Sequence, residues 1–204
     1  MDDSIQKPRI RSFKKGDMLA SFAYGKFSYT GSYFIYQRVR LLEHEFDNAI
    51  SDVKLSPMGN FHGKFEYAVA NRLGLGLNVD YFSQELKWTE NAVSQSSGLD
   101  TIYYSSDKGF TLNITARMNI HIVTRNKADL FLGVQAGLNA GKYKYTTSNP
   151  NPNKDIKVDY QIPAGRFVFG MTLGFRYYVN SKMAILTEVG YASSVFQIGG
   201  SYKF

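Results

Sequence analysis

Charged side chains recur in this sequence within segments that alternate between apolar and polar residues. Six stand out: Lys64, Glu66, Asp80, Arg117, Arg176 and Glu188. In a segment with a two-residue period, these residues share one face and their apolar neighbours share the other. Charges that are buried together must pair to be tolerated, so the sequence predicts an ion-pair network, with Glu188 and Arg176 in diagonal reach across one turn. A proton or ion pathway is the alternative.

Histidines and serines raise the question of nucleophilic catalysis. His44, His62, Ser193 and Ser194 all fall near the same end of the expected elements, and a nucleophile needs an oriented base beside it. Their spacing matches no deacylase or acyltransferase signature, so we assign no catalytic residue. His121 is expected on the polar face. The sequence has no cysteine, no metal-ligand cluster and no dinucleotide loop, so it indicates neither a metal nor a cofactor.

Alternation of apolar and polar residues defines the elements that carry these side chains. Between Phe110 and Ile122, seven apolar residues stay in phase, which a helix cannot produce. Similar runs predict eight strands, at about 17–30, 61–69, 73–81, 110–122, 130–138, 167–177, 185–191 and 196–204. The segments 31–59, 89–108 and 146–165 are polar or irregular, and we expect long loops there.

Length and charge narrow the class of protein. A chain of 204 residues with no cysteine and 15% aromatic residues fits a single domain. The net charge is +7, but lysines and arginines are scattered and no nucleic-acid-binding motif occurs, so we expect no nucleic-acid partner. No run approaches the roughly 20 apolar residues of a membrane helix. The start of the chain lacks the apolar core of a signal peptide, so we interpret the sequence as a mature chain.

The two faces of the strands predict an all-β fold, a closed antiparallel eight-stranded transmembrane up-and-down β-barrel. One face is apolar over roughly 9–11 residues, the length with which a tilted strand crosses a bilayer. The other face carries glycine, polar residues and charges, which suit a narrow lumen. Aromatic residues gather near strand ends, among them Tyr81, Trp88 and Phe110, as interfacial girdles do. A soluble ligand-binding barrel with an apolar interior is the alternative.

The strand pattern, the even strand number and the terminal Tyr202-Lys-Phe204 resemble the small eight-stranded outer-membrane family that includes OmpX, OmpW, the opacity-type adhesins and the OmpA transmembrane domain. The resemblance implies a location in the outer membrane of a Gram-negative bacterium and removal of a signal peptide. It also implies that Tyr202 and Phe204 form an assembly signal for the barrel-assembly machinery. Residues 1–16 are then expected to be a flexible periplasmic tail and residues 17–204 the barrel.

A resemblance in architecture implies little about function. We expect a structural, adhesive or partner-binding role, through extracellular loops or in a complex with an unidentified protein. A lipid A or phospholipid acyl-modifying enzyme and a narrow channel for small apolar solutes are the alternatives. Four lysines share the lipid-facing parity beyond the apolar band, namely Lys26, Lys87, Lys142 and Lys144. Long cationic side chains there are expected to contact lipopolysaccharide phosphates.

Overall fold

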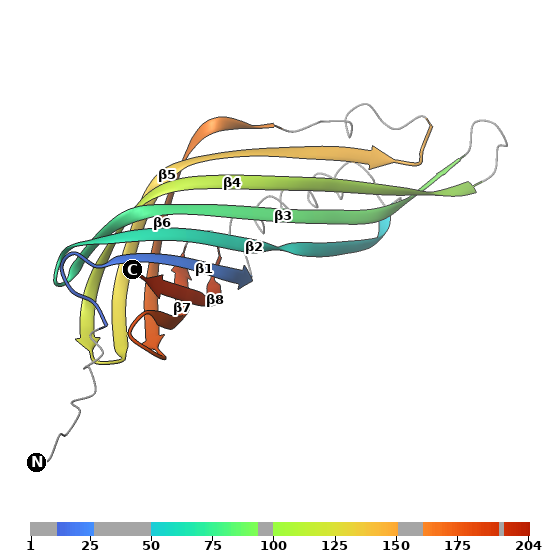
Figure 1. Ribbon diagram of the computed structural model, residues 1–204. Coiled ribbons are helices and arrows are strands. Elements are labelled where there is room, and N and C mark those ends of the chain that lie inside the picture. The colour runs from blue at the N-terminus through green and yellow to red at the C-terminus, as the bar shows by residue number, and fades with distance from the viewer. Residues whose placement is uncertain (1–11, 27–49, 94–99, 151–160, 192–193) are drawn as a thin grey trace, which may run out of the picture.

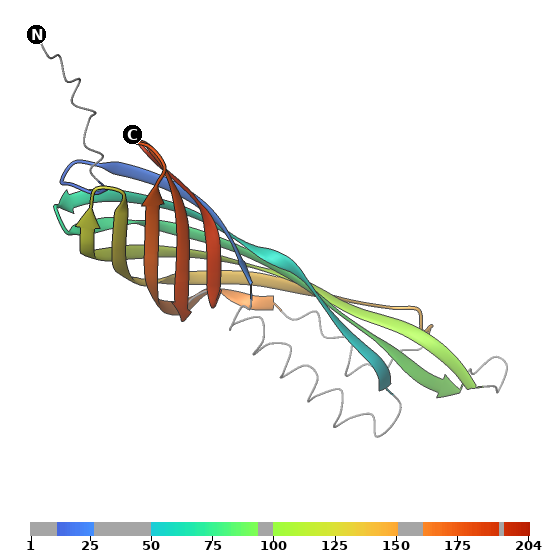
Figure 2. The same cartoon turned by 90° about the horizontal axis from the view of Figure 1, so that it is seen from below.

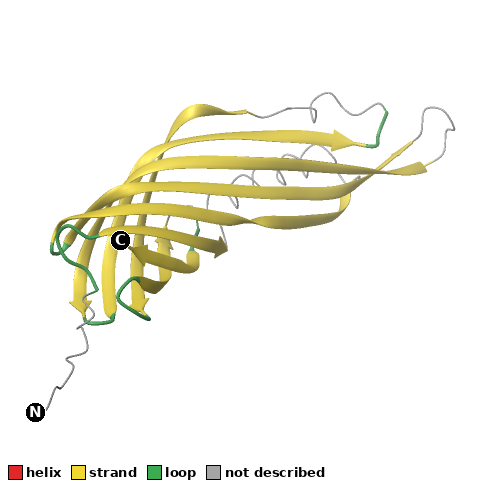
Figure 3. Ribbon diagram, viewed as in Figure 1, coloured by secondary structure: helices red, strands yellow, loops and turns green. Residues whose placement is uncertain are grey.

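Eight antiparallel strands form one closed barrel (Figures 1 and 3). The computed structural model describes residues 12–26, 50–93, 100–150, 161–191 and 194–204. The strands are β1 (Met18–Lys26), β2 (Ile50–Ala70), β3 (Leu73–Val93), β4 (Asp100–Arg125), β5 (Ala128–Thr147), β6 (Gln161–Tyr178), β7 (Met183–Tyr191) and β8 (Phe196–Lys203). Each strand pairs with the next, and β8 pairs with β1. The predicted eight-stranded closed fold is confirmed.

Strict alternation along each strand separates an apolar exterior from a polar interior. In β4, Ile114 and Met118 are exposed while Thr115 and Arg117 between them are buried. The same order holds in β1, where Phe22 is exposed beside buried neighbours. Successive side chains in a strand point to opposite faces, so the pattern read from the sequence is the pattern of the barrel wall. Among the described residues, no helix is long and apolar enough to cross a membrane.

The wall of the barrel has very different heights around its circumference (Figures 1 and 2). Strands β2 to β5, which we call the tall wall, contain 21, 21, 26 and 20 residues. Strands β1, β7 and β8, which we call the low wall, contain 9, 9 and 8 residues. Both walls begin near the same end, so the tall wall projects far beyond the low wall at the other end.

One of the expected long loops is largely strand, and strands extend into the ends of another. Instead of a loop over 89–108, β3 continues to Val93 and β4 starts at Asp100, and these two residues pair directly. Likewise, β5 runs to Thr147 and β6 begins at Gln161, within the expected loop 146–165. Beyond the bilayer neither face needs to be apolar, so backbone pairing continues after the alternation has faded. Strand β2 starts at Ile50, inside the expected loop 31–59, of which residues 31–49 lie outside the described residues.

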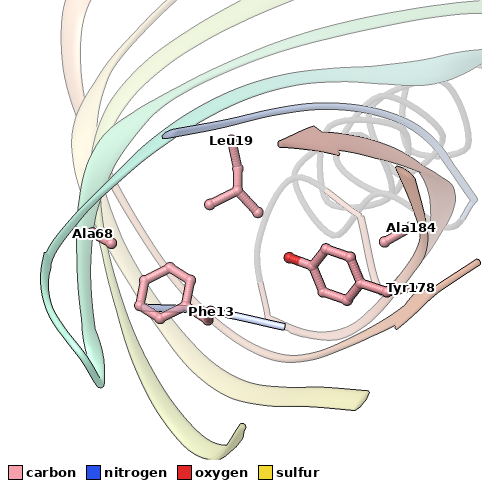
Figure 4. Packing of buried hydrophobic residues seen from close by; sticks show 5 residues of the cluster. All are labelled: Phe13, Leu19, Ala68, Tyr178 and Ala184. Atoms are coloured by element: carbon pink, nitrogen blue, oxygen red, sulfur yellow. The ribbon is translucent and has the colours of Figure 1, made fainter. Parts of the chain in front are cut away.

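The end with the short connections is closed by the N-terminal segment. Ser12 and Phe13 are buried in the mouth of the barrel, and the Gly16 amide donates to the Ala68 carbonyl at 2.9 Å. Phe13 clusters with Leu19, Ala68, Tyr178 and Ala184 (Figure 4). Of the tail expected over 1–16, residues 1–11 lie outside the described residues, Ser12 and Phe13 are buried in the barrel, and Lys14, Lys15 and Gly16 are exposed. Short turns and both chain ends mark this as the periplasmic end.

Closure of the barrel predicts that the terminal aromatic residue is needed for assembly. The Phe204 amide donates to the Met18 carbonyl at 3.0 Å, which extends the β8–β1 seam by one residue, and its ring lies edge-on to Tyr202. We expect Phe204→Ala to lower the yield of heat-modifiable barrel in membranes. The matched control is Phe167→Ala, because Phe167 is as exposed (68% against 64%) but lies within β6, away from the β8–β1 seam. Equal yields from both variants would contradict the prediction.

Candidate functional site

The lumen holds polar side chains in three layers, and the layer nearest the periplasm is built on one arginine. Arg176 contacts Glu66 at 2.6 Å and Asp129 at 3.3 Å. His121 bridges the same two carboxylates, at 2.9 Å to Glu66 and 2.6 Å to Asp129. The Arg176 guanidinium also lies over the Phe131 ring, 4.4 Å from its centroid. Every member is buried, so the layer is a closed charge network packed on an aromatic ring.

The middle layer is built on one carboxylate. Glu188 contacts Lys64 at 2.8 Å and Arg117 at 3.0 Å. The Lys64 ammonium also donates to the Gln197 amide oxygen at 2.6 Å, and Arg117 donates to the Thr172 hydroxyl at 3.0 Å. These five side chains come from five different strands, so the layer ties opposite walls of the barrel together across the lumen.

The outer layer differs because it centres on a histidine and a serine. The His62 Nδ1 atom lies 2.5 Å from the Asp80 carboxylate, and His62 Nε2 lies 2.7 Å from Ser194 Oγ. The Asn60 amide donates to the same Ser194 oxygen at 2.8 Å, and the Asn78 amide donates to Asp80 at 2.9 Å. All five residues are buried. Among the described residues, no group of His, Cys, Asp and Glu side chains is arranged to hold a metal ion.

The structure brings the six predicted lumen charges inside the barrel, but not with the expected pairing. Arg176 and Glu188 occupy diagonal register positions, since Arg176 is opposite Leu186 and Glu188 is opposite Gly174. Their side chains nevertheless extend into different layers, and no ion pair joins them among the contacts of the described residues. Arg176 and Glu188 do not pair because each side chain instead contacts charged partners on other strands across the narrow lumen. A prediction from one hairpin cannot include those partners.

Sequence reasoning missed three members of the periplasmic layer. His121 was expected only to face the polar side, and Asp129 and Phe131 were not assigned to the network. Phe131 did leave a signal, because it is the one large apolar residue on the polar parity of the predicted strand 130–138. It is fully buried under Arg176. The lone aromatic on the polar face of this strand is therefore the partner of a buried cation.

The four predicted surface lysines lie on the outside of the barrel. Lys26, Lys87, Lys142 and Lys144 are all exposed. Lys26 lies on β1 in the low wall, whereas the other three lie on the outer face of the tall wall together with Lys54 and Lys108. Trp88, expected in the aromatic girdle, is instead 1% exposed on the inner face. It donates to Glu90 at 2.9 Å and stacks on Tyr145. Even-numbered residues of β3 face the lumen, so continuing the alternation from Asp80 to Trp88 predicts the inward position that the structure shows.

The exterior decides the environment in which the barrel resides. Each strand contributes large exposed apolar side chains to one belt, for example Phe22, Phe65, Leu77, Ile114, Leu138, Phe169, Ile185 and Ile198. A belt of this extent is incompatible with water, and a closed ring leaves no unpaired edge facing lipid. The chain is an outer-membrane β-barrel. Its even strand number and its short turns at the end with both termini agree with that class. A soluble barrel with an apolar interior is excluded by the charged lumen.

Comparisons with known proteins find similarity only among solved structures, at low sequence identity. The sequence matches no family model and no curated protein. Among solved structures, it is similar to Ail, the attachment invasion locus protein of Yersinia pestis, in complex with the heparin analogue sucrose octasulfate, with 12% identity, 93% of this chain and 99% of that chain covered, and a TM-score of 0.42. It is also similar to OprG from Pseudomonas aeruginosa, with 15% identity, 95% and 98% coverage, and a TM-score of 0.45.

The periplasmic layer predicts a large stability effect for its arginine. Arg176→Met keeps the volume but leaves Glu66 and Asp129 without the guanidinium, and breaking a buried ion pair costs roughly 3–5 kcal/mol. Urea unfolding of the barrel in lipid vesicles measures the loss. The control is Arg125→Met, at an exposed position in the last residue of β4, which we expect to change stability by less than about 0.5 kcal/mol. Similar unfolding midpoints for the two variants would refute this assignment.

The filled lumen predicts that the barrel does not conduct. Three layers of paired side chains and the inserted Phe13 block the axis, and an eight-stranded barrel has an interior only wide enough for side chains. We expect planar-bilayer recordings of the wild-type barrel to show no sustained conductance. Stable open-channel steps would show that the layers part in the membrane and would favour the narrow-channel alternative.

Proposed function

We propose that the barrel is a surface-binding protein whose tall wall binds the phosphates of lipopolysaccharide and presents the projecting strands outside the cell. The observation that carries this proposal is the placement of lysines on the outer face of that wall. Lys54 is directly opposite Lys87, and Lys108 is directly opposite Lys144. An adhesive or partner-binding role is compatible with the same projection, because β2 to β5 extend beyond the rest of the barrel (Figure 2).

Lysines that face one another across a strand pair are unfavourable without an anion. Like charges directly opposite on a sheet destabilise the pairing. Glu85 offsets part of this repulsion, since it lies 3.4 Å from Lys87 and is directly opposite Lys108. The side chain of Lys87 still has 56% of its surface exposed. The remaining positive charge supports binding of a multivalent anion such as a pair of phosphates.

The level of these lysines supports a lipid headgroup as the ligand. Tyr81 and Phe110 stack on the exterior with ring centroids 6.3 Å apart, and exposed aromatic residues mark the interface between acyl chains and headgroups. Lys142 is directly opposite Phe110. Lys108 and Lys144 lie two residues further out, about 7 Å along the strand. The cations therefore follow the aromatic residues in the outward order in which phosphates follow acyl chains.

Exchange of the lysines for glutamine tests the proposal. The variant carries Gln at Lys87, Lys108, Lys142 and Lys144. Each exposed ion pair contributes about 0.2–1 kcal/mol, so loss of four lysines should weaken lipopolysaccharide binding roughly tenfold, which corresponds to about 1.4 kcal/mol. Thermal stability should fall in bilayers that contain lipopolysaccharide but should not fall in plain detergent, where the exchange relieves the repulsion between opposed lysines.

A matched control removes the same number of charges from the other end. It carries Gln at Lys14, Lys15, Lys127 and Lys182, which are exposed at the periplasmic end. This control should bind lipopolysaccharide as the wild type does. If both quadruple variants lose the same affinity for lipopolysaccharide, the loss is explained by net charge alone and the proposed surface is wrong. If neither variant loses affinity, the proposed ligand is wrong.

A further inference from the structure

We propose that Ser194, His62 and Asp80 form a nucleophilic site that cleaves or transfers an acyl ester of an outer-leaflet lipid. Ser194 lies between β7 and β8, His62 lies on β2, and Asp80 lies on β3. His62 and Asp80 are direct register partners. Closure of the barrel brings Ser194 beside them, although it is more than a hundred residues away in sequence. No short motif encodes such an arrangement, so the sequence placed His62 and Ser194 near the same end of the barrel without predicting their contact.

The hydrogen-bond order fixes the role of each group. The Asp80 carboxylate only accepts, so at 2.5 Å it places the imidazole proton on His62 Nδ1. His62 Nε2 is then an acceptor for the Ser194 hydroxyl at 2.7 Å. A hydroxyl on a base that is itself oriented by a carboxylate is the arrangement that activates a serine nucleophile, and both distances lie within the required range.

Two neighbours complete the site. A Cβ atom at Gly25 would collide with Ser194 Oγ and would lie 2.7 Å from His62 Nε2. Glycine at this position therefore makes room for the serine to reach the imidazole. The Asn60 amide, which donates to Ser194 Oγ at 2.8 Å, is a neutral donor close to the point where an oxyanion develops.

The position of the site defines the substrate class. Ser194 lies at the outer rim of the low wall, where β7 ends at Tyr191 and β8 begins at Phe196. The exterior beside it exposes Tyr24, Tyr191, Val195 and Phe196, which suit acyl chains just below the headgroup layer. Lipid esters lie at this boundary. Ser194 itself is 1% exposed, so an ester reaches Oγ only by displacing a neighbouring side chain.

The reaction follows from these placements. Ser194 Oγ attacks the ester carbonyl carbon while its proton passes to His62 Nε2, and the Asn60 amide stabilises the oxyanion. Collapse of this intermediate breaks the bond to the alkoxy oxygen, which takes the proton from His62 and leaves as an alcohol. Water, or a hydroxyl of a second lipid, then attacks the acyl-serine with His62 again as base. The products are a carboxylic acid or a new ester, and free Ser194.

Covalent labelling tests the nucleophile on the whole barrel. An alkyl fluorophosphonate is incubated with folded wild-type protein, and the modified residue is located by mass spectrometry. We expect label at Ser194 in the wild type and in the control Ser201→Ala, which removes another buried lumen serine. Ser194→Ala should take none. His62→Gln should label roughly 10²–10⁴-fold more slowly, because it lacks the general base.

Two further measurements keep the proposal open to refutation. Heat-modifiability on gels reports folding, and Gly25→Ala provides a second way to separate Ser194 from His62 if His62→Gln fails to fold. Absence of label in folded wild type, or unchanged labelling in a folded His62→Gln or Gly25→Ala, overturns the nucleophile. Acyl release is then measured separately from glycerophospholipid and from lipopolysaccharide, which identifies the source of the ester. Labelling without acyl release from either lipid overturns the substrate class.

Discussion

Pairing of every backbone group is the constraint on which the rest of this structure depends. Within a bilayer an unpaired N–H or C=O group costs several kcal/mol, so β8 must return to β1. The register of that seam, from Leu19 opposite Lys203 to Lys26 opposite Phe196, closes the ring with the shortest strands of the barrel. A ring of eight strands has a narrow interior, so the inward-facing side chains fill it.

Filling a narrow lumen with charges requires that they neutralise one another locally. Arg176 is balanced by Glu66 and Asp129, while Glu188 balances Lys64 and Arg117. Each layer draws its members from strands on different sides, so the ion pairs act as crosslinks as well as neutralising charge. The outer layer is organised differently, around a histidine hydrogen-bonded to a carboxylate and a hydroxyl. A layer of that composition offers chemistry that the paired layers below it do not.

Period-2 alternation made the fold, the strand number and the inward parity of the charges predictable, because lipid on one side and a packed lumen on the other impose it on every membrane-spanning residue. Where lipid ends, the constraint ends, and residues such as Thr89 and Ser105 were read as loop although they continue β3 and β4. Side-chain contacts across the lumen also could not be predicted from the sequence. Alternation states that Ser194 and His62 share an end of the barrel, but only the curvature of the closed sheet places their atoms in contact.

The proposed nucleophilic site and the proposed phosphate-binding surface lie at successive depths in the membrane, and β3 contributes residues to both. Outward along β3 come Asp80, which orients the base, then Tyr81 in the aromatic belt, and then Lys87 on the outer face. A lipid anchored in the outer leaflet presents its groups in the same order, with ester bonds beneath and phosphates above. A binding surface for phosphate on the tall wall and an ester-directed nucleophile at the rim of the low wall are thus each placed at the depth that their chemistry requires. Unequal wall heights allow both, because the low wall ends where the ester layer begins while the tall wall continues past it.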